Sequence, residues 1–147
     1  MDLIKTARTL ILEAAQARLV LILRASGYAT DAGQCVFAGE ITAIGPDDPE
    51  QAISVVLGID TPGRPLTQVP IQISALARAD IDEPWLAAEA ILGDIRTAME
   101  TTDRTLGGLV KTMEKGSVQP YPREPGSTVV GVTITYLATY VDWWGHL

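Results

Sequence analysis

The chain has 147 residues, of which 47% are hydrophobic and 20% are charged, a composition that fits one globular domain with its own core. The longest apolar run, residues 19–23, is too short to cross a bilayer, and the N-terminal residues lack the pattern of a signal peptide. We therefore expect a single domain over residues 1–147, made in the cytoplasm and without a membrane partner. The one cysteine, Cys35, excludes an intrachain disulfide and a zinc site built from cysteines.

The net charge of −7 is concentrated in the middle of the chain. Residues 40–103 carry a net charge of −9, whereas residues 1–39 and residues 104–147 each carry +1. An acidic surface repels phosphate backbones, so we expect any role near DNA to let the DNA slide past rather than to grip it. The alternative is that these acidic residues only keep a small protein soluble.

Hydrophobic spacing predicts the elements of the first half. Apolar residues recur at spacings of three and four over residues 2–18, which predicts an amphipathic helix. Residues 19–23 could prolong this helix or begin a strand, because periodicity cannot separate the two in so short a run, and we expect a short strand. Loops should follow over residues 25–52, which are rich in Gly and Pro around a short apolar piece at residues 35–38.

Two strands are predicted next, because hydrophobic and polar residues alternate over residues 53–60 and again over residues 68–78. A turn rich in Pro and Gly separates them, so we expect an antiparallel hairpin. Pro70 has no amide hydrogen, and the second strand should therefore lie at an edge or begin its pairing after that residue.

A second helix is predicted to begin at Pro84, behind a capping carboxylate within residues 80–83. Gly93 inside this helix suggests a close approach by a neighbouring element. The expected buried face consists of Trp85, Ala88, Ile91, Leu92, Ile95 and Met99, and the expected outer face of Glu89, Asp94, Arg96 and Glu100.

The last third is predicted to form a long hairpin, with strands at residues 106–118 and 129–140 around a turn rich in Pro. The element order is then α-β-β-α-β-β. This order predicts an α+β fold in which two helices cover one mixed or antiparallel sheet. The hairpin is long enough to reach a neighbouring subunit.

The residues that could support catalysis are few. The only histidine, His146, stands next to the last residue, and no serine or cysteine triad can be assembled around it. The acidic pairs Asp47–Asp48 and Asp82–Glu83, the latter with Asp80 nearby, could attract a divalent cation, but they occur where turns and helix caps belong. We therefore predict no catalytic residue, no metal ligand and no cofactor, and expect the surface to carry the function.

Large aromatic residues near the end of the chain are the first candidates for a surface role. Tyr140, Trp143 and Trp144 cluster there, and Tyr121 stands at the turn of the last hairpin. Aromatic residues often anchor subunit interfaces, so all four are predicted at a subunit interface. The alternative is that they pack under the sheet.

Several short motifs in the middle and the second half of the chain occur in a distinctive order. A helix ending in Thr102-Asp103-Arg104-Thr105 is followed by Leu106-Gly107-Gly108-Leu109-Val110 and by a long strand with Val132-Thr133-Ile134-Thr135-Tyr136. Before them come Gly45-Pro46-Asp47-Asp48-Pro49-Glu50 and Val69-Pro70-Ile71-Gln72-Ile73. Over about residues 40–142, the chain resembles the phage tail terminator and minor tail protein family, which includes tail-completion and head–tail joining relatives.

The resemblance implies a structural subunit of the virion tail or neck, assembled in the cytoplasm of the host bacterium. Such subunits form a ring, expected to be hexameric, on the last ring of the tail tube protein. The ring stops tube polymerisation and offers its other face to the head connector or neck protein, without any catalysis. Asp47, Asp48 and Glu50 would then face the lumen or a partner, and DNA would pass through without being specifically bound.

Two other classes remain open at this stage. An α+β domain of this order could be a small ligand-binding or regulatory domain without catalysis. An enzyme that uses carboxylates alone is the third class.

Overall fold

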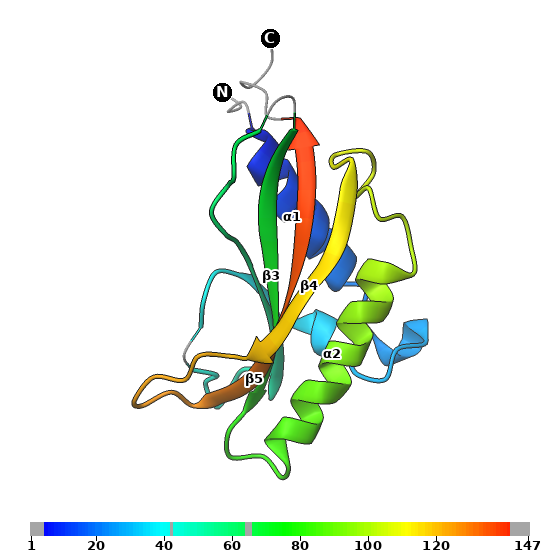
Figure 1. The fold of residues 1–147 in the computed structure, drawn as a ribbon. Coiled ribbons are helices and arrows are strands. Elements are labelled where there is room, and N and C mark those ends of the chain that lie inside the picture. The colour runs from blue at the N-terminus through cyan, green and yellow to red at the C-terminus, as the bar shows by residue number, and fades with distance from the viewer. Residues whose placement is uncertain (1–4, 42, 64–65, 142–147) are drawn as a thin grey trace, which may run out of the picture.

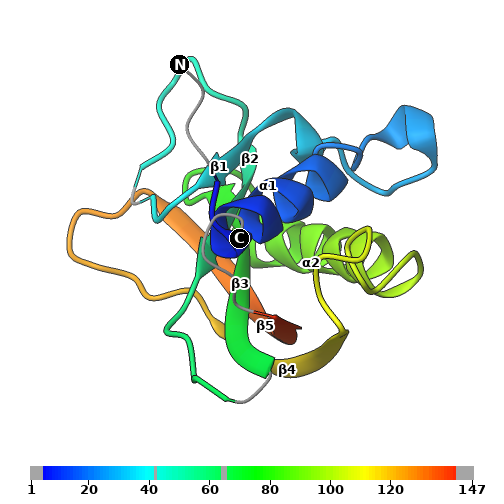
Figure 2. The same cartoon turned by 90° about the horizontal axis from the view of Figure 1, so that it is seen from above.

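The computed structural model describes residues 5–41, 43–63 and 66–141. Two helices and five strands form an α+β fold (Figure 1), as the sequence predicted. Both helices lie on the same side of one mixed sheet (Figure 2). The helices are α1 (Ala7–Leu19) and α2 (Pro84–Glu100), and the strands are β1 (Val36–Ala38), β2 (Gln51–Leu57), β3 (Leu66–Arg78), β4 (Thr112–Pro120) and β5 (Val129–Val141).

The strand order is β1-β2-β3-β5-β4, with β1 parallel to β2 and every other pair antiparallel. The expected hairpins β2–β3 and β4–β5 are both present. The predicted element order lacked β1, because a strand of three residues has too few positions to show an alternation. Its parallel pairing places Val36 opposite Ile53, at the start of β2.

The strand predicted at residues 19–23 is wrong. Leu19 is the last residue of α1, and η1 (Arg24–Ser26) follows after one turn. Leu19 and Ile22 are fully buried, so the apolar run anchors the end of the helix in the core. The helix itself begins after Thr6, whose hydroxyl accepts a hydrogen bond from the amide of Thr9.

Pro70 lies in a central strand, so of the two predicted alternatives the edge position is wrong, and pairing that begins after the proline holds on the β2 side. With β2 the paired register begins at Ile71, one residue after the proline, whereas with β5 it runs through Pro70. The carbonyl of Pro70 accepts from the amide of Gly58 at 2.8 Å, but the proline cannot donate in return. Arg8 of α1 replaces the missing donor, because its Nη1 lies 2.9 Å from the Gly58 carbonyl.

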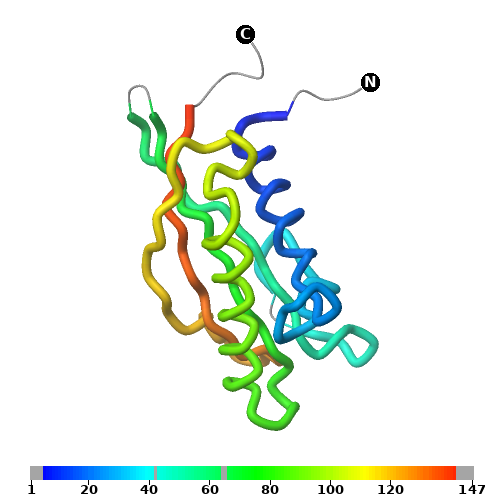
Figure 3. Tube along the Cα trace, turned by 90° about the vertical axis from the view of Figure 1, so that its right-hand side faces the viewer, coloured from blue at the N-terminus to red at the C-terminus, as the bar shows by residue number. Residues whose placement is uncertain are grey.

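Helix α2 covers the predicted residues, but its cap and some of its side chains differ from the prediction. Pro84 occupies the first turn, yet Glu83 before it has φ 51° and makes no capping bond with its side chain, so the expected cap is wrong. Trp85, in the first turn of α2, is 51% exposed and does not belong to the buried face. This turn lies near one end of the domain (Figure 3). Gly93 faces open space, so no close approach explains it.

Asp94 was expected on the outer face of α2 and is 6% exposed. Its carboxylate accepts hydrogen bonds from the amides of Ala29 and Thr30, at 3.0 and 2.8 Å, and from the Thr30 hydroxyl at 2.7 Å. The loop before η2 (Ala32–Gln34) therefore covers this side of the helix. A buried carboxylate is tolerated here because three donors satisfy it.

The strand expected from residue 106 begins only at Thr112. A turn precedes it, in which Leu106, Gly107 and Gly108 have φ values of 50°, 73° and 91°. Two of these three left-handed positions are therefore occupied by glycine, the residue that adopts them most easily. The Asp103 carboxylate holds the turn by accepting from the amides of Thr105 and Gly107.

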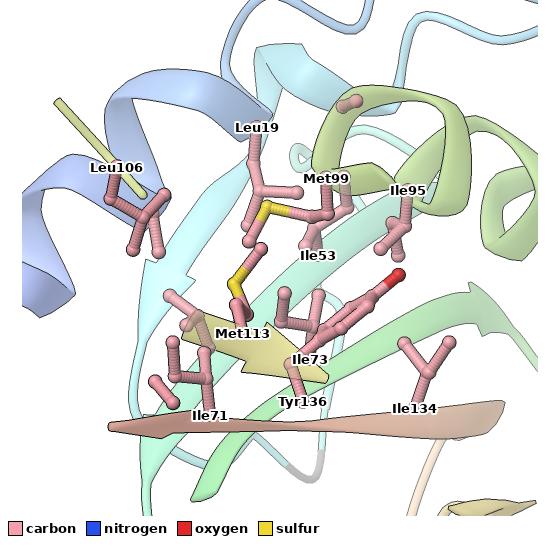
Figure 4. Packing of buried hydrophobic residues seen from close by; sticks show 14 of the residues in the cluster. Leu19, Ile53, Ile71, Ile73, Ile95, Met99, Leu106, Met113, Ile134 and Tyr136 are labelled. Atoms are coloured by element: carbon pink, nitrogen blue, oxygen red, sulfur yellow. The ribbon is translucent and has the colours of Figure 1, made fainter. Parts of the chain in front are cut away.

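The main core lies between the helices and the sheet (Figure 4). It includes Leu19 of α1, Ile95 and Met99 of α2, Ile73 of β3 and Tyr136 of β5. A smaller cluster lies on the opposite side of the sheet, where loops cover one end of it. Its buried members are Ile44, Ala52, Leu76 and Val129, and Cys35, Ile41 and Tyr121 pack against them.

Candidate functional site

The loop carboxylates predicted from the sequence lie at one end of the sheet, where the loop before β2 meets the loop after β3. Arg78, the last residue of β3, joins the two loops. Its Nη2 donates to the carbonyls of Gly45 and Asp48, at 3.0 Å each, and its Nε lies 3.8 Å from Oδ1 of Asp80. The charge of Arg78 is therefore directed at the backbone, which fixes the loops in place.

Six exposed carboxylates belong to these two loops. Asp48 also has a structural role, because its Oδ2 accepts from the amide of Gly45 at 2.8 Å. In the described parts of the chain, no three His, Cys, Asp or Glu side chains are grouped so that they could hold a metal ion. We call this set the acidic end: Asp47, Asp48, Glu50, Asp80, Asp82 and Glu83.

The sequence pointed to Asp47, Asp48 and Glu50 as surface carboxylates, and all three are exposed. It missed that the loop of residues 79–83 meets the loop that carries them, since the acids of residues 80–83 were assigned to a helix cap. The juxtaposition comes from the β2–β3 pairing, in which the amide of Arg78 donates to the carbonyl of Glu50 at 2.9 Å. The predicted hairpin of residues 53–60 and 68–78 was the one signal that could have shown it.

A pocket of about 320 Å³ opens beside the acidic end. The residues directly before β5 form one of its walls. Thr128 binds both loops, because the amide of Ala79 donates to its carbonyl and the amide of Ile44 donates to its hydroxyl. The lining residues are Ile44, Pro46, Arg78, Ala79, Asp80, Ser127 and Thr128.

Tyr121, predicted at a subunit interface, is half-buried and tied to its own chain. Its hydroxyl accepts from the amide of Ile41 at 3.2 Å and donates to the carbonyl of the same residue at 2.9 Å. Burial raises the pKa of this phenol above its ordinary value. Tyr121 thus fixes the loop after β1 and leaves only part of its ring for a partner.

Tyr140 was predicted at a subunit interface, but it lies in the main core with 1% of its surface exposed. Its hydroxyl donates to Oδ2 of Asp60 at 2.8 Å, and Oδ1 of the same carboxylate lies 2.5 Å from Nη1 of Arg8. A neighbouring subunit cannot reach this ring. Trp143 and Trp144 lie outside the described residues.

A second buried tyrosine forms a polar contact that the sequence did not reveal. Tyr136 donates from its hydroxyl to Oε2 of Glu100 at 2.7 Å, and Nε of Arg96 donates to the same oxygen at 3.1 Å. Partial burial acts to raise the pKa of the Glu100 carboxyl, but these hydrogen bonds outweigh it, so the pKa is lowered. The pKa of Tyr136 is raised by burial and by the carboxylate. The contact joins α2 to β5 and serves the fold.

Cys35 is partly buried at the edge of the smaller cluster. Burial, with a smaller effect of Asp48, raises the pKa of its thiol above the ordinary value. The thiol is therefore held in its protonated form at neutral pH, which makes it a poor nucleophile.

No helix within the described residues is both long and apolar enough to span a membrane. A comparison of the sequence with protein-family models gives no match, and a comparison with curated proteins gives none either.

Proposed function

We propose that this protein is the subunit of an oligomeric ring, expected to be hexameric, that caps a phage tail tube. The ring stops polymerisation of the tube protein and joins the tail to the head connector in the neck of the virion. The proposal starts from the order of motifs that resembles tail terminator proteins, and the α+β fold is compatible with it. The single observation that carries it beyond the resemblance is the acidic end.

DNA that leaves or enters a phage particle must pass such a ring without sticking to it. Carboxylates repel phosphates over roughly the Debye length, about 8–10 Å at physiological ionic strength. A ring that turned the acidic end of every subunit towards its lumen would hold DNA away from the wall. Repulsion of DNA would account for the position of these carboxylates in two adjoining loops.

The backbone contacts of Arg78 matter for this proposal. Loops that were free to bend could fold their carboxylates against the nearest cation and lose the repulsion. Arg78 is the one basic residue in residues 43–50 and 78–83, and its guanidinium is engaged by two carbonyls. Oδ1 of Asp80 lies 3.8 Å from Nε of Arg78, and Asp48 accepts from the amide of Gly45. The exposed carboxylates of Asp47, Glu50, Asp82 and Glu83 are the ones that would supply a fixed negative surface.

The test replaces Asp47 and Glu50 with Lys in the particle that carries the protein. Asp48 stays unchanged, since its carboxylate holds the loop. We expect tails of normal length but slower DNA ejection and lower infectivity. The control makes the same change of charge at Glu89 of α2 and Glu114 of β4, which are exposed elsewhere on the domain. Ejection at the wild-type rate by both double variants would show that the acidic end only keeps the protein soluble.

A second candidate function is that of a small ligand-binding or regulatory domain without catalysis. The observation that favours it is the pocket of about 320 Å³ beside Arg78 and Asp80. A protein of this class would remain a monomer at every concentration, and a ligand in the pocket would raise its melting temperature. Assembly into rings would favour the first function.

A further inference from the structure

The pocket beside the acidic end has one charge of each sign on its wall. Arg78 supplies the positive charge, and Asp80, two residues further along the chain, supplies the negative one. The two groups are not committed to one another, because Nε of Arg78 and Oδ1 of Asp80 lie 3.8 Å apart, beyond the range of a hydrogen bond. The side chain of Asp80 is 75% exposed, so its carboxylate is open to a ligand.

The guanidinium of Arg78 retains donors after it has bound the loops. Of its five N–H groups, the two on Nη2 donate to the carbonyls of Gly45 and Asp48. Nε is buried and has no hydrogen-bond partner among the described residues, and Nη1 has none there either. A carboxylate is the ligand group that suits such donors, because hydrogen bonds between two charged groups are stronger than those between neutral ones.

The charges around the pocket disfavour a ligand of either single sign. Besides Asp80, five exposed carboxylates belong to the two adjoining loops, and their field opposes the approach of a simple anion. A simple cation would meet the charge of Arg78. A zwitterion with its carboxylate next to an ammonium group avoids both penalties, because each of its charges has an opposite partner and its net charge is zero.

The rest of the pocket wall is uncharged. Ile44, Pro46 and Ala79 give it aliphatic surface, and Ser127 and Thr128 complete the lining. The volume of about 320 Å³ lies at the small end of the range for ligand sites, which is roughly 300–1,000 Å³. The pocket therefore suits a small zwitterion with an aliphatic part.

We propose that the pocket binds a free α-amino acid with an aliphatic side chain, whose carboxylate pairs with Arg78 and whose ammonium group pairs with Asp80. An α-amino acid carries both charges on groups attached to one carbon atom, which matches two opposite charges that lie side by side on the wall. Its side chain would contact Pro46 and Ala79. This inference rests on the second candidate function, because it names the class of ligand for that pocket, and it does not depend on ring assembly.

The first part of the test uses L-valine and L-leucine as ligands of the wild-type protein. Calorimetric titration should detect binding of at least one of them, and this amino acid should raise the melting temperature. Its N-acetyl derivative lacks the ammonium group, and its amide lacks the carboxylate. Each derivative should bind about tenfold or more weakly than the free amino acid, since each loses one charged partner.

The second part compares two variants with the same change of charge. Asp80→Asn removes the negative charge from the pocket wall and should weaken binding about tenfold or more. The control is Asp82→Asn, at an exposed position of the same loop that is not among the lining residues, and it should change binding less than about twofold. Both side chains are exposed, so the melting temperatures without ligand should stay close to that of the wild type.

The outcomes separate this inference from the proposed ring. Failure of the wild type to bind either amino acid at millimolar concentrations overturns the inference. Equal binding of either derivative also overturns it, as does an equal loss of binding in the two variants. Sedimentation decides the ring independently: rings without bound amino acid leave the ring standing, whereas a monomer that binds as expected supports the inference and favours the second candidate function.

Discussion

The two faces of the sheet differ although the same strands build them. Along β3, Val69, Ile71 and Ile73 are fully buried under the helices, whereas Gln68 and Gln72, which alternate with them, are exposed. The face under the helices stabilises the fold through apolar contacts. On the side away from the helices, β3 carries neutral polar and aliphatic residues and, at its end, Arg78. A step of one residue along a strand thus separates a position in the main core from one on the other side of the sheet.

The largest effect on stability should come from removing a side chain that packs between the helices and the sheet. Ile95→Ala removes a fully buried side chain of α2 and should lower the free energy of unfolding by about 2–5 kcal/mol. Trp85→Ala, on the same helix but half-exposed, should cost about 1 kcal/mol or less. Chemical denaturation of both variants measures the difference. Equal losses would show that the face of α2 is assigned wrongly.

The buried carboxylate of Asp94 should come next. Asp94→Ala leaves the amides of Ala29 and Thr30 without their acceptor, which should cost about 1–3 kcal/mol. Hydrogen exchange at these two amides should accelerate as well. Asp82→Ala, at an exposed position, serves as the control and should change the stability by less than about 0.5 kcal/mol. Unchanged exchange at Ala29 and Thr30 would contradict the contact.

A smaller effect is expected on the opposite side of the sheet. Tyr121→Phe keeps the ring but removes the hydroxyl that binds the amide and the carbonyl of Ile41, with a cost of about 1 kcal/mol. Exchange at the Ile41 amide should accelerate, while exchange in α2 should stay as in the wild type. A uniform change throughout the protein would mean that the two clusters unfold as one unit and that the distinction between the faces is too sharp.

The smallest effect concerns pH. The pKa of Glu100 is lowered in the folded protein, so its contribution to stability is present above the ordinary value of 4.5 and is lost as the pH falls through the folded value. Glu100→Gln has no such titration. The wild type should therefore exceed this variant in stability at neutral pH, and the difference should shrink in acid. A difference that stays constant from pH 6 to about pH 3 would contradict the lowered pKa.

Long alternations and helical spacing were enough to predict β3, β5 and α2 within a few residues. The apolar run at residues 19–23 was misassigned because five residues fit a strand and a helix end equally well. Asp94 was misplaced because its donors lie 64 and 65 residues away in the chain. The same limit applies to the acidic end, whose two loops are brought together by strand pairing. A hydrophobic pattern reports what one element buries, but not which polar groups a distant loop brings to it.

The most direct test of ring assembly is the mass of the wild-type protein under native conditions, measured at several concentrations and with added tail tubes. We predict a closed ring, of six copies if the resemblance to tail terminators extends to the number of subunits. Rings should also be visible at the tube end in negative-stain images. A protein that stays strictly monomeric at high micromolar concentration, and that forms no ring on the tubes, would contradict the proposed function.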